Sequence, residues 1–184
     1  MTHSINWEQA YKQGRGYATL SVASLTFIIE KLDKESPNTA LDIGCGTGQV
    51  CRDLFHRKFD AVGIDISQEA IKQAKESSGY IGKGIDFSQC DVENESLPKG
   101  KYGLIICKDT YAFFKDKNAF LRSVLNIMHP DGMFVIVSPS ADQVPLAKKH
   151  IAVDHAKTIK MLGTLFSKID HTTRGNGEFY LCQL

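Results

Sequence analysis

A run of glycines in the first third of the chain has the residue types and spacing of a ligand-binding turn. The segment Ala40-Leu-Asp-Ile-Gly-Cys-Gly-Thr-Gly48 is an apolar stretch that ends in glycines at alternating positions. Glycine lets the backbone approach a ligand closely, and a helix that begins beyond the turn offers unpaired backbone N–H groups. The run departs from the dinucleotide fingerprint G-x-G-x-x-G, because Gly48 comes one position early and Gln49 follows it.

Two acidic residues follow the glycine turn, each at the end of a strand-like segment. Asp65 stands where a carboxylate can accept hydrogen bonds from both hydroxyls of a ribose. Asp91 stands where its carboxylate can accept a hydrogen bond from the amino group of an adenine, and Ile66 can lie against the adenine face. Because the carboxyl ends of parallel strands meet at one sheet edge, these side chains point to one crevice. Either acid taken alone could instead form a turn or cap a helix.

Strand-like segments alternate with helical ones along the chain, which predicts an α/β fold: a three-layer, doubly wound, mostly parallel sheet. A short glycine-rich loop joins the last two predicted strands, so we expect an antiparallel C-terminal hairpin. The predicted strands are Thr39–Ile43, Phe59–Ile64, Gly84–Cys90, Tyr102–Cys107, Met133–Val137, Phe166–Thr172 and Glu178–Cys182. The predicted helices are Ala18–Lys31, Gln49–Arg57, Ser67–Glu76, Lys117–Met128 and a long helical stretch over Ala141–Leu162. Pro130-Asp-Gly is expected to form a turn.

The composition and net charge of the chain exclude several classes of protein. The chain has 184 residues, 42% of them hydrophobic and 23% charged, which excludes disordered, collagen-like and coiled-coil proteins. The apolar runs are far short of the roughly 20 residues that span a bilayer, and the N-terminus does not resemble a signal peptide. The net charge of +1 does not favour nucleic acid or a membrane surface as a partner. These features predict a soluble, cytoplasmic, single-domain protein over residues 1–184.

The five cysteines are dispersed and form no C-x-x-C pair. This arrangement predicts neither a disulfide framework nor a zinc site, and the six histidines are equally scattered. We expect reduced thiols in a cytosolic protein and no bound metal.

At the glycine turn and the two acids, the sequence resembles the class I S-adenosylmethionine-dependent methyltransferases. Leu41-Asp-Ile-Gly-Cys-Gly-Thr-Gly48 is similar to their first motif, Val62-Gly-Ile-Asp65 to the second and Cys90-Asp91-Val92 to the third. Tyr102–Cys107 and Met128–Val135 are similar to the segments of strands four and five. The resemblance covers roughly residues 38 to 138. It implies a seven-stranded sheet that holds S-adenosylmethionine across its carboxyl edge and releases S-adenosylhomocysteine.

The resemblance also implies a role for each matched position. Gly44, Cys45 and Gly46 would lie against the methionine part of the cofactor, while Asp42 would orient the glycine loop. Asp65 would hold the ribose, with Ile66 beside the adenine. The remaining matched positions are Asp91 and the backbone of Val92, which would recognise the adenine, and the backbone of Cys107 and Lys108, which would face the methionine amino group.

Two regions outside these motifs would complete the site. Residues 1–35 resemble the helical lid segment of small-molecule methyltransferases, with residues 36–184 as a Rossmann-like core. Tyr11 and Arg15 could close over the cofactor, although aromatic spacing in that segment also suits core packing. After the fourth strand, Asp109 and Tyr111 are candidates for lining the acceptor pocket, one as a base and the other as a wall or hydroxyl donor; packing of the next helix is the alternative reading.

The favoured function is transfer of a methyl group to a small-molecule acceptor by in-line displacement. The stretch Lys108-Asp-Thr-Tyr111 lacks the paired prolines typical of methyltransferases that act on planar amino groups. A protein or RNA acceptor is an alternative, as is a non-catalytic regulatory or partner protein that binds the cofactor. A nicotinamide-dependent oxidoreductase is a further alternative, which the early third glycine and the second acid disfavour.

Overall fold

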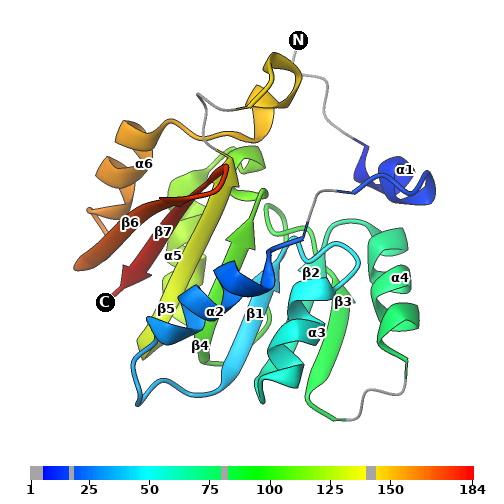
Figure 1. The fold of residues 1–184 in the computed structure, drawn as a ribbon, viewed down its shortest axis with the longest axis horizontal. Helices are drawn as coiled ribbons and strands as arrows, with labels where there is room; N and C mark the ends of the chain where they lie inside the picture. Colours follow the sequence, from blue (N-terminus) through cyan, green and yellow to red (C-terminus); the bar gives the residue numbers. More distant parts are fainter. Residues whose placement is uncertain (1–5, 17–18, 80–82, 140–143) are drawn as a thin grey trace.

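A computed structural model describes residues 6–16, 19–79, 83–139 and 144–184. Its centre is a seven-stranded sheet in the order β3-β2-β1-β4-β5-β7-β6 (Figure 1). β1 to β5 are parallel to one another, while β7 is antiparallel to both β5 and β6. The strands are β1 (Thr39–Ile43), β2 (Asp60–Asp65), β3 (Ile85–Gln89), β4 (Tyr102–Lys108), β5 (Met128–Pro139), β6 (Lys168–Arg174) and β7 (Gly177–Gln183).

Helices cover both faces of the sheet and give three layers (Figure 1). One face carries α2 (Val22–Glu30), α3 (Gln49–His56) and α4 (Gln68–Ser78), whose apolar side chains share one core cluster with residues of β1 to β5 and β7. The other carries α5 (Lys117–Ile127) and α6 (His155–Leu162). The remaining elements are α1 (Trp7–Lys12) and the two 3₁₀ helices η1 (Tyr111–Phe113) and η2 (Leu146–Ile151). The predicted mostly parallel, doubly wound sheet with an antiparallel C-terminal hairpin is confirmed.

Strand register brings the carboxyl ends of the parallel strands to one edge. Ile43 at the end of β1 pairs with Ile64 on one side and with Cys107 on the other. Lys108, which ends β4, pairs with Val137 of β5. The turns after β1, β2, β3 and β4 therefore share one side of the molecule, as expected for ligand binding in an open α/β sheet.

The long helix predicted over Ala141–Leu162 is wrong in its described part. η2 ends at Ile151, and α6 begins only after Asp154, whose carboxylate accepts a hydrogen bond from the backbone N–H of Lys157 at 2.9 Å. Aspartate favours such a capping position over a helix interior, so it starts a new helix. Residues 141–143 of the predicted stretch lie outside the described residues.

Two other boundaries differ from prediction. α2 begins at Val22 because the Ser21 hydroxyl caps it by accepting from the backbone N–H of Ser24 at 3.1 Å; Ala18 lies outside the described residues. β5 runs from residue 128 to 139, so the predicted turn at Pro130-Asp-Gly lies inside the strand. Between Tyr102 and Leu104 the pairing advances by two residues on β4 but by five on β5, from Met128 to Met133, so the segment with Pro130 and Gly132 is an irregularity without a partner on β4.

Candidate functional site

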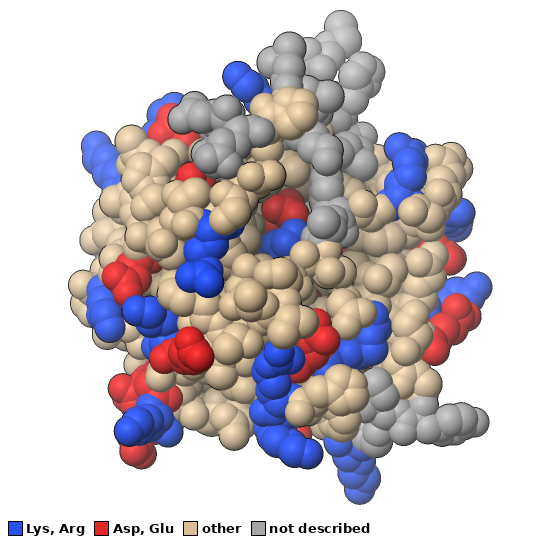
Figure 2. Space-filling model, in the orientation of Figure 1, with Lys and Arg blue, Asp and Glu red and all other residues tan. Residues whose placement is uncertain are grey.

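A cavity of about 410 Å³ opens at the carboxyl edge of the sheet. Figure 2 shows a hollow in this face of the molecule with acidic and basic side chains inside it; elsewhere on the same face, charges of both signs are interspersed. The volume lies within the range of small-molecule sites. Its lining comes from α1 and the following residues, the turns after β1 to β4, and η1: Trp7, Tyr11, Gly14, Arg15, Gly16, Thr19, Ile43, Gly44, Cys45, Gly46, Thr47, Gln49, Val50, Ile64, Asp65, Ile66, Gln73, Cys90, Asp91, Val92, Glu93, Lys108, Asp109, Thr110, Phe113 and Phe114.

The glycine turn after β1 forms the floor of this cavity. The backbone N–H groups of Gly44 and Cys45 both donate to the carbonyl of Ile64, at 2.8 and 2.9 Å, which fixes the turn to the end of β2. Gly44 has φ +76°, and a Cβ placed there would lie 2.1 Å from Oγ1 of Thr110. Only glycine fits both the backbone angle and the space.

Asp65 ties the glycine turn to the start of α4. One carboxylate oxygen accepts from the backbone N–H of Gly46 at 2.9 Å, and the other accepts from the backbone N–H of Ser67 at 2.9 Å. Burial raises the pKa of Asp65, while these N–H donors act in the opposite direction. Each carboxylate oxygen has two acceptor positions, so the side chain retains capacity for further donors such as hydroxyls.

Asp42 lies beneath the turn and outside the cavity lining. Its side chain is 3% exposed and accepts a weak hydrogen bond from the Cys51 thiol at 3.9 Å. Burial, reinforced by the charge of Asp65, raises the pKa of Asp42 from 3.8 to about 7, and the Lys108 ammonium opposes the shift. The site therefore contains a buried carboxyl group that is partly protonated near neutral pH.

The third strand contributes Asp91 and Val92 to the cavity wall. The Asp91 carboxylate accepts from the backbone N–H of Glu93 at 3.1 Å and from the side-chain amide of Asn94 at 2.8 Å. Ile66 lies at the cavity with 49% of its surface exposed, one of three large apolar side chains so exposed among the described residues. Asp91 thus holds a turn together and faces the cavity at the same time.

β4 ends in a turn that places a charge pair at the cavity. Asp109 has φ +55°, a left-handed conformation that is uncommon for residues other than glycine. Its backbone N–H donates to the Val137 carbonyl at 2.8 Å, and its carboxylate forms an ion pair with Lys108. Strained backbone of this kind is concentrated at functional sites.

Tyr111 and Cys107, both predicted near the site, are not among the cavity-lining residues. Tyr111, the first residue of η1, is 1% exposed in the core cluster that it shares with the sheet and α5, and its hydroxyl donates to the Met161 sulfur at 3.4 Å. Burial raises its pKa. Cys107 is fully buried, and burial likewise raises the pKa of its thiol. Of the two candidates after β4, only Asp109 reaches the cavity.

α1 lies across the opposite rim of the cavity. The Tyr11 hydroxyl lies 2.7 Å from where a Cβ on Gly46 would stand, so this side chain covers the glycine turn. The Trp7 ring packs edge-on against Phe113 of η1, with 5.5 Å between ring centroids. Arg15 lines the cavity and donates through two guanidinium nitrogens to the Gln13 side chain, at 2.6 and 3.1 Å. We call α1 with Trp7 and Tyr11 the roof of the cavity.

Comparison with protein-family models identifies the family of this chain. A family model described as a methyltransferase domain matches residues 34–177. The chain belongs to this methyltransferase family. The predicted resemblance to the class I enzymes is therefore confirmed, and the match includes the glycine turn, Asp65, Asp91 and β6, and ends at Gly177, the first residue of β7.

Relatives of this methyltransferase domain are distant. It is 26% identical to the malonyl-[acyl-carrier protein] O-methyltransferase of Acetivibrio thermocellus over 83% of the chain and 54% of that protein. A TehB-like methyltransferase from Corynebacterium glutamicum shares the fold with a TM-score of 0.69 and 14% identity, covering 96% and 93% of the two chains. The plantazolicin methyltransferase BpumL, solved with S-adenosylhomocysteine, has a TM-score of 0.69 and 19% identity over 86% and 81%. The first curated relatives are longer: the chain spans 27% to 54% of their length.

The described part of the methyltransferase domain contains no group of three His, Cys, Asp or Glu side chains placed to hold a metal ion. All five cysteines are buried and form no disulfide. None of the helices within the described ranges is both long and apolar enough to cross a membrane.

Several lining residues were not predicted from the sequence. Trp7 comes from a segment with no strand-end motif, Glu93 directly follows the motif of Asp91 and Val92, and Phe113 and Phe114 come from the aromatic stretch after β4. The run Tyr111-Ala-Phe-Phe114 was the available signal, because aromatic residues directly after a strand end often line ligand sites. α1 has only six residues, which is too short for its hydrophobic periodicity to show which face contacts the cavity.

Proposed function

We propose that this domain transfers a methyl group from S-adenosylmethionine to a small-molecule acceptor by in-line displacement. The observation that carries the proposal is one shared cavity. The glycine turn, Asp65 and Asp91 line one part of it, and Asp109, Phe113 and Phe114 line another. A methyl donor and its acceptor must meet in such a common space for direct transfer.

The residues of the first part suit this cofactor. Asp65 retains acceptor positions for ribose hydroxyls, and Asp91 with the backbone of Val92 faces the cavity as an adenine site requires. The methionine part would lie against Gly44, Cys45 and Gly46, near the backbone of Lys108. Cys107 would contribute through its backbone, and Asp42 would support the loop from below. BpumL was solved with S-adenosylhomocysteine, which supports the same class of ligand here.

The chemistry asks little of the protein beyond position and protection from water. The bound cofactor would supply an electrophilic methyl group. The roof and η1 would exclude water from the cavity and hold the acceptor in line. A hydroxyl acceptor would donate its proton to the Asp109 carboxylate, whereas an amine would enter in its neutral form. Asp109 is therefore the proposed base for an oxygen acceptor, and Tyr111 has a structural role.

A small acceptor suits an enclosed cavity better than a protein or RNA does. The curated relatives include a ubiquinone biosynthesis O-methyltransferase and a phosphoethanolamine N-methyltransferase, both named for small-molecule chemistry. Charges of both signs are interspersed on the face shown in Figure 2, which does not favour a nucleic acid there. We place the protein in the cytoplasm, where its five buried thiols would stay reduced.

Calorimetric titration tests the cofactor assignment. S-adenosylmethionine and S-adenosylhomocysteine are titrated into wild type, Asp65→Asn and the matched control Asp170→Asn, whose side chain is 62% exposed. We expect binding to wild type and to the control, and a loss of about tenfold or more for Asp65→Asn, from weakened hydrogen bonds to a charged group. Absence of binding to wild type, or binding of NAD instead, would overturn the proposal.

Binding without turnover would favour the non-catalytic alternative. The assay presents a panel of small alcohols, phenols, amines and thiols with the labelled methyl donor and measures methylated product. Asp109→Asn is the matched variant. It should abolish transfer to a hydroxyl acceptor while leaving S-adenosylhomocysteine affinity close to that of wild type.

A further inference from the structure

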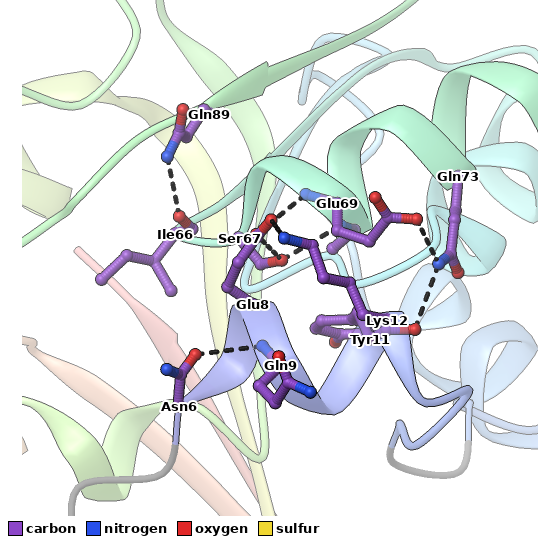
Figure 3. A network of polar contacts seen from close by, with 11 residues as sticks. Asn6, Glu8, Gln9, Tyr11, Lys12, Ile66, Ser67, Glu69, Gln73 and Gln89 are labelled. Atoms are coloured by element: carbon purple, nitrogen blue, oxygen red, sulfur yellow. Dashed lines mark hydrogen bonds and ion pairs between the residues drawn. The ribbon is translucent and has the colours of Figure 1, made fainter.

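A glutamate on the roof makes the main polar contact between α1 and the rest of the protein. The Glu8 carboxylate accepts from the Ser67 hydroxyl at 2.8 Å and from the backbone N–H of Glu69 at 3.0 Å (Figure 3). Both donors belong to the first turn of α4. A carboxylate is favoured there, because the first N–H groups of a helix have no partner within the helix and carry its positive end.

This contact continues to the floor of the cavity through hydrogen bonds. Ser67, which binds Glu8 through its hydroxyl, donates its backbone N–H to Asp65. Asp65 in turn accepts from the backbone N–H of Gly46. The roof and the glycine turn are thus joined through two side chains, although Glu8 and Ser67 are 59 positions apart in the sequence.

A second contact fixes the orientation of α1. The Gln73 side-chain amide donates to the Tyr11 carbonyl at 3.2 Å, and Glu69 accepts from the same amide nitrogen at 2.9 Å (Figure 3). Glu8 and Tyr11 lie one turn apart on α1, so α4 contacts this helix at two levels. This orientation turns Tyr11 toward Gly46 and Trp7 toward Phe113.

We propose that Glu8 is a positioning residue for the reaction: it docks α1 on α4 and so holds Trp7 and Tyr11 over the cavity. The inference rests on the proposed function for its effect on the cofactor, and on geometry alone for the docking. A six-residue helix is too short to be stable by itself in water, so the roof depends on such contacts.

Two other contacts show that the hydrogen bonds of Glu8 to α4 serve to dock α1 and have no second purpose within either helix. Lys12 pairs with Glu8 at 3.3 Å within α1, so this ion pair does not connect the helix to α4. α4 does not need Glu8 as its cap, because the Ser67 hydroxyl also accepts from the backbone N–H of Ala70 at 3.1 Å. The Glu8 contacts to Ser67 and Glu69 are therefore specific to the docked roof.

The first test is spectroscopic and needs no ligand. Trp7 is the only tryptophan in the chain, so its emission reports on the roof alone. Emission spectra and acrylamide quenching are measured for wild type, Glu8→Ala and Glu8→Gln. The control Glu76→Gln removes one glutamate charge from α4, where Glu76 is 64% exposed and pairs only distantly, at 4.0 Å, with Lys72.

We expect Glu8→Ala to shift Trp7 emission to longer wavelength and to increase quenching. Glu8→Gln should give a smaller change, because its amide oxygen still accepts hydrogen bonds. The control should match wild type, and far-UV circular dichroism should show at most the small loss of helix signal that unfolding of the six-residue α1 would cause. A Trp7 signal that is identical in wild type and Glu8→Ala would overturn the docking role.

The second test measures how the Glu8 variants change the affinity for the ligand. The dissociation constant of S-adenosylhomocysteine should rise about threefold to tenfold in Glu8→Ala, as expected for loss of charge-assisted hydrogen bonds. It should rise less in Glu8→Gln and stay unchanged in Glu76→Gln. A shifted Trp7 signal with unchanged affinity would overturn the positioning role. If wild type binds no cofactor, the proposed function fails and the positioning role fails with it, while the ligand-free spectra still decide the docking contact separately.

Discussion

The floor and the roof of the cavity are built from different kinds of segment. The floor consists of turns that directly follow β1, β2 and β4, so buried strands on both sides fix its backbone. The roof is a six-residue helix that hydrogen bonds attach to α4. The Glu8 carboxylate contacts Ser67, and the backbone carbonyl of Tyr11 contacts the Gln73 side chain. The backbone of the floor is therefore held on both sides, whereas the position of the roof depends on a few partly buried hydrogen bonds.

This difference indicates how each part tolerates change. Replacement of a floor residue must distort packed backbone, which is costly in a close-packed interior. Replacement of a roof residue removes a contact between partly exposed groups, and such contacts contribute little individually. We expect effects to fall steadily in size from the floor to the roof.

The largest effect should come from Gly44→Ala. Its Cβ would lie 2.1 Å from Oγ1 of Thr110, at φ +76°. We expect at least about a hundredfold loss of S-adenosylhomocysteine affinity, equivalent to about 2.7 kcal/mol, by calorimetry. The matched control is Gly175→Ala, at φ +58° with no atom within 4 Å, which should cost only about 1–2 kcal/mol of stability from backbone strain and leave affinity unchanged. Equal affinities for both variants would remove the distinction between a packed turn and an open one.

Asp42→Asn should reveal the buried charge beneath the floor. The folded pKa of Asp42, about 7, lies above its ordinary value of 3.8, so the native state holds the proton more tightly between these values. Wild-type stability from this group is full below pH 3.8 and falls as pH rises toward 7. The stability of the variant relative to wild type should increase over that window by up to about 4 kcal/mol. Urea unfolding at pH 5 and pH 8 measures this, and a difference in stability that is the same at both pH values would contradict it.

A pair of tyrosine variants compares roof and core directly. Tyr11→Phe removes the hydroxyl above Gly46, and we expect a modest loss of affinity, by about fivefold or less, as for one exposed hydrogen-bonding group. Tyr111→Phe removes a hydroxyl that contacts only the Met161 sulfur among the hydrogen bonds described, so affinity should match wild type. Loss of binding in Tyr111→Phe alone would reverse the roles given to these two residues.

The smallest effect should be acid release of the roof. Hydrogen bonds from the Glu69 backbone and the Ser67 hydroxyl lower the pKa of Glu8 below 4.5. Its contribution to docking is therefore present above pH 4.5 and is lost as pH falls through the lowered value. Trp7 emission should be constant from pH 7 to pH 5 and shift below pH 4.5, before the far-UV signal changes. In Glu8→Gln the same shift should be missing; its persistence would place the titrating group elsewhere.

The floor could be predicted from the sequence because its signals are local. The glycine run, Asp65 and Asp91 each stand at or just after the end of a predicted strand, and the strands themselves set the edge where they meet. The roof could not be predicted in this way, since Glu8 contacts residues about 60 positions away and nothing near it in sequence marks them. That the N-terminal segment covers the cavity rested on family resemblance alone.

The errors have equally physical causes. The stretch before Leu162 has helical composition, but Asp154 divides it because its side chain competes for backbone N–H groups. Pro130 and Gly132 carry a strong turn signal, and they lie in an irregular segment of β5, between Met128 and Met133, that interrupts the pairing with β4 without ending the strand. The residue type of Tyr111 and its place after a strand suggested a site residue, and only three-dimensional packing shows that its ring turns into the core.

The place of β7 in the sheet affects how the protein can be synthesised. β7 comes after the other described strands in the sequence, yet it lies between β5 and β6 and is their shared partner in this part of the sheet. While residues 177–183 are still inside the ribosome, the backbone of Phe134–Pro139 on β5 has no strand along one side. Such an open apolar edge invites pairing with other chains. A nascent chain stalled before Gly177 is therefore expected to require a chaperone even though β1 to β5 are complete.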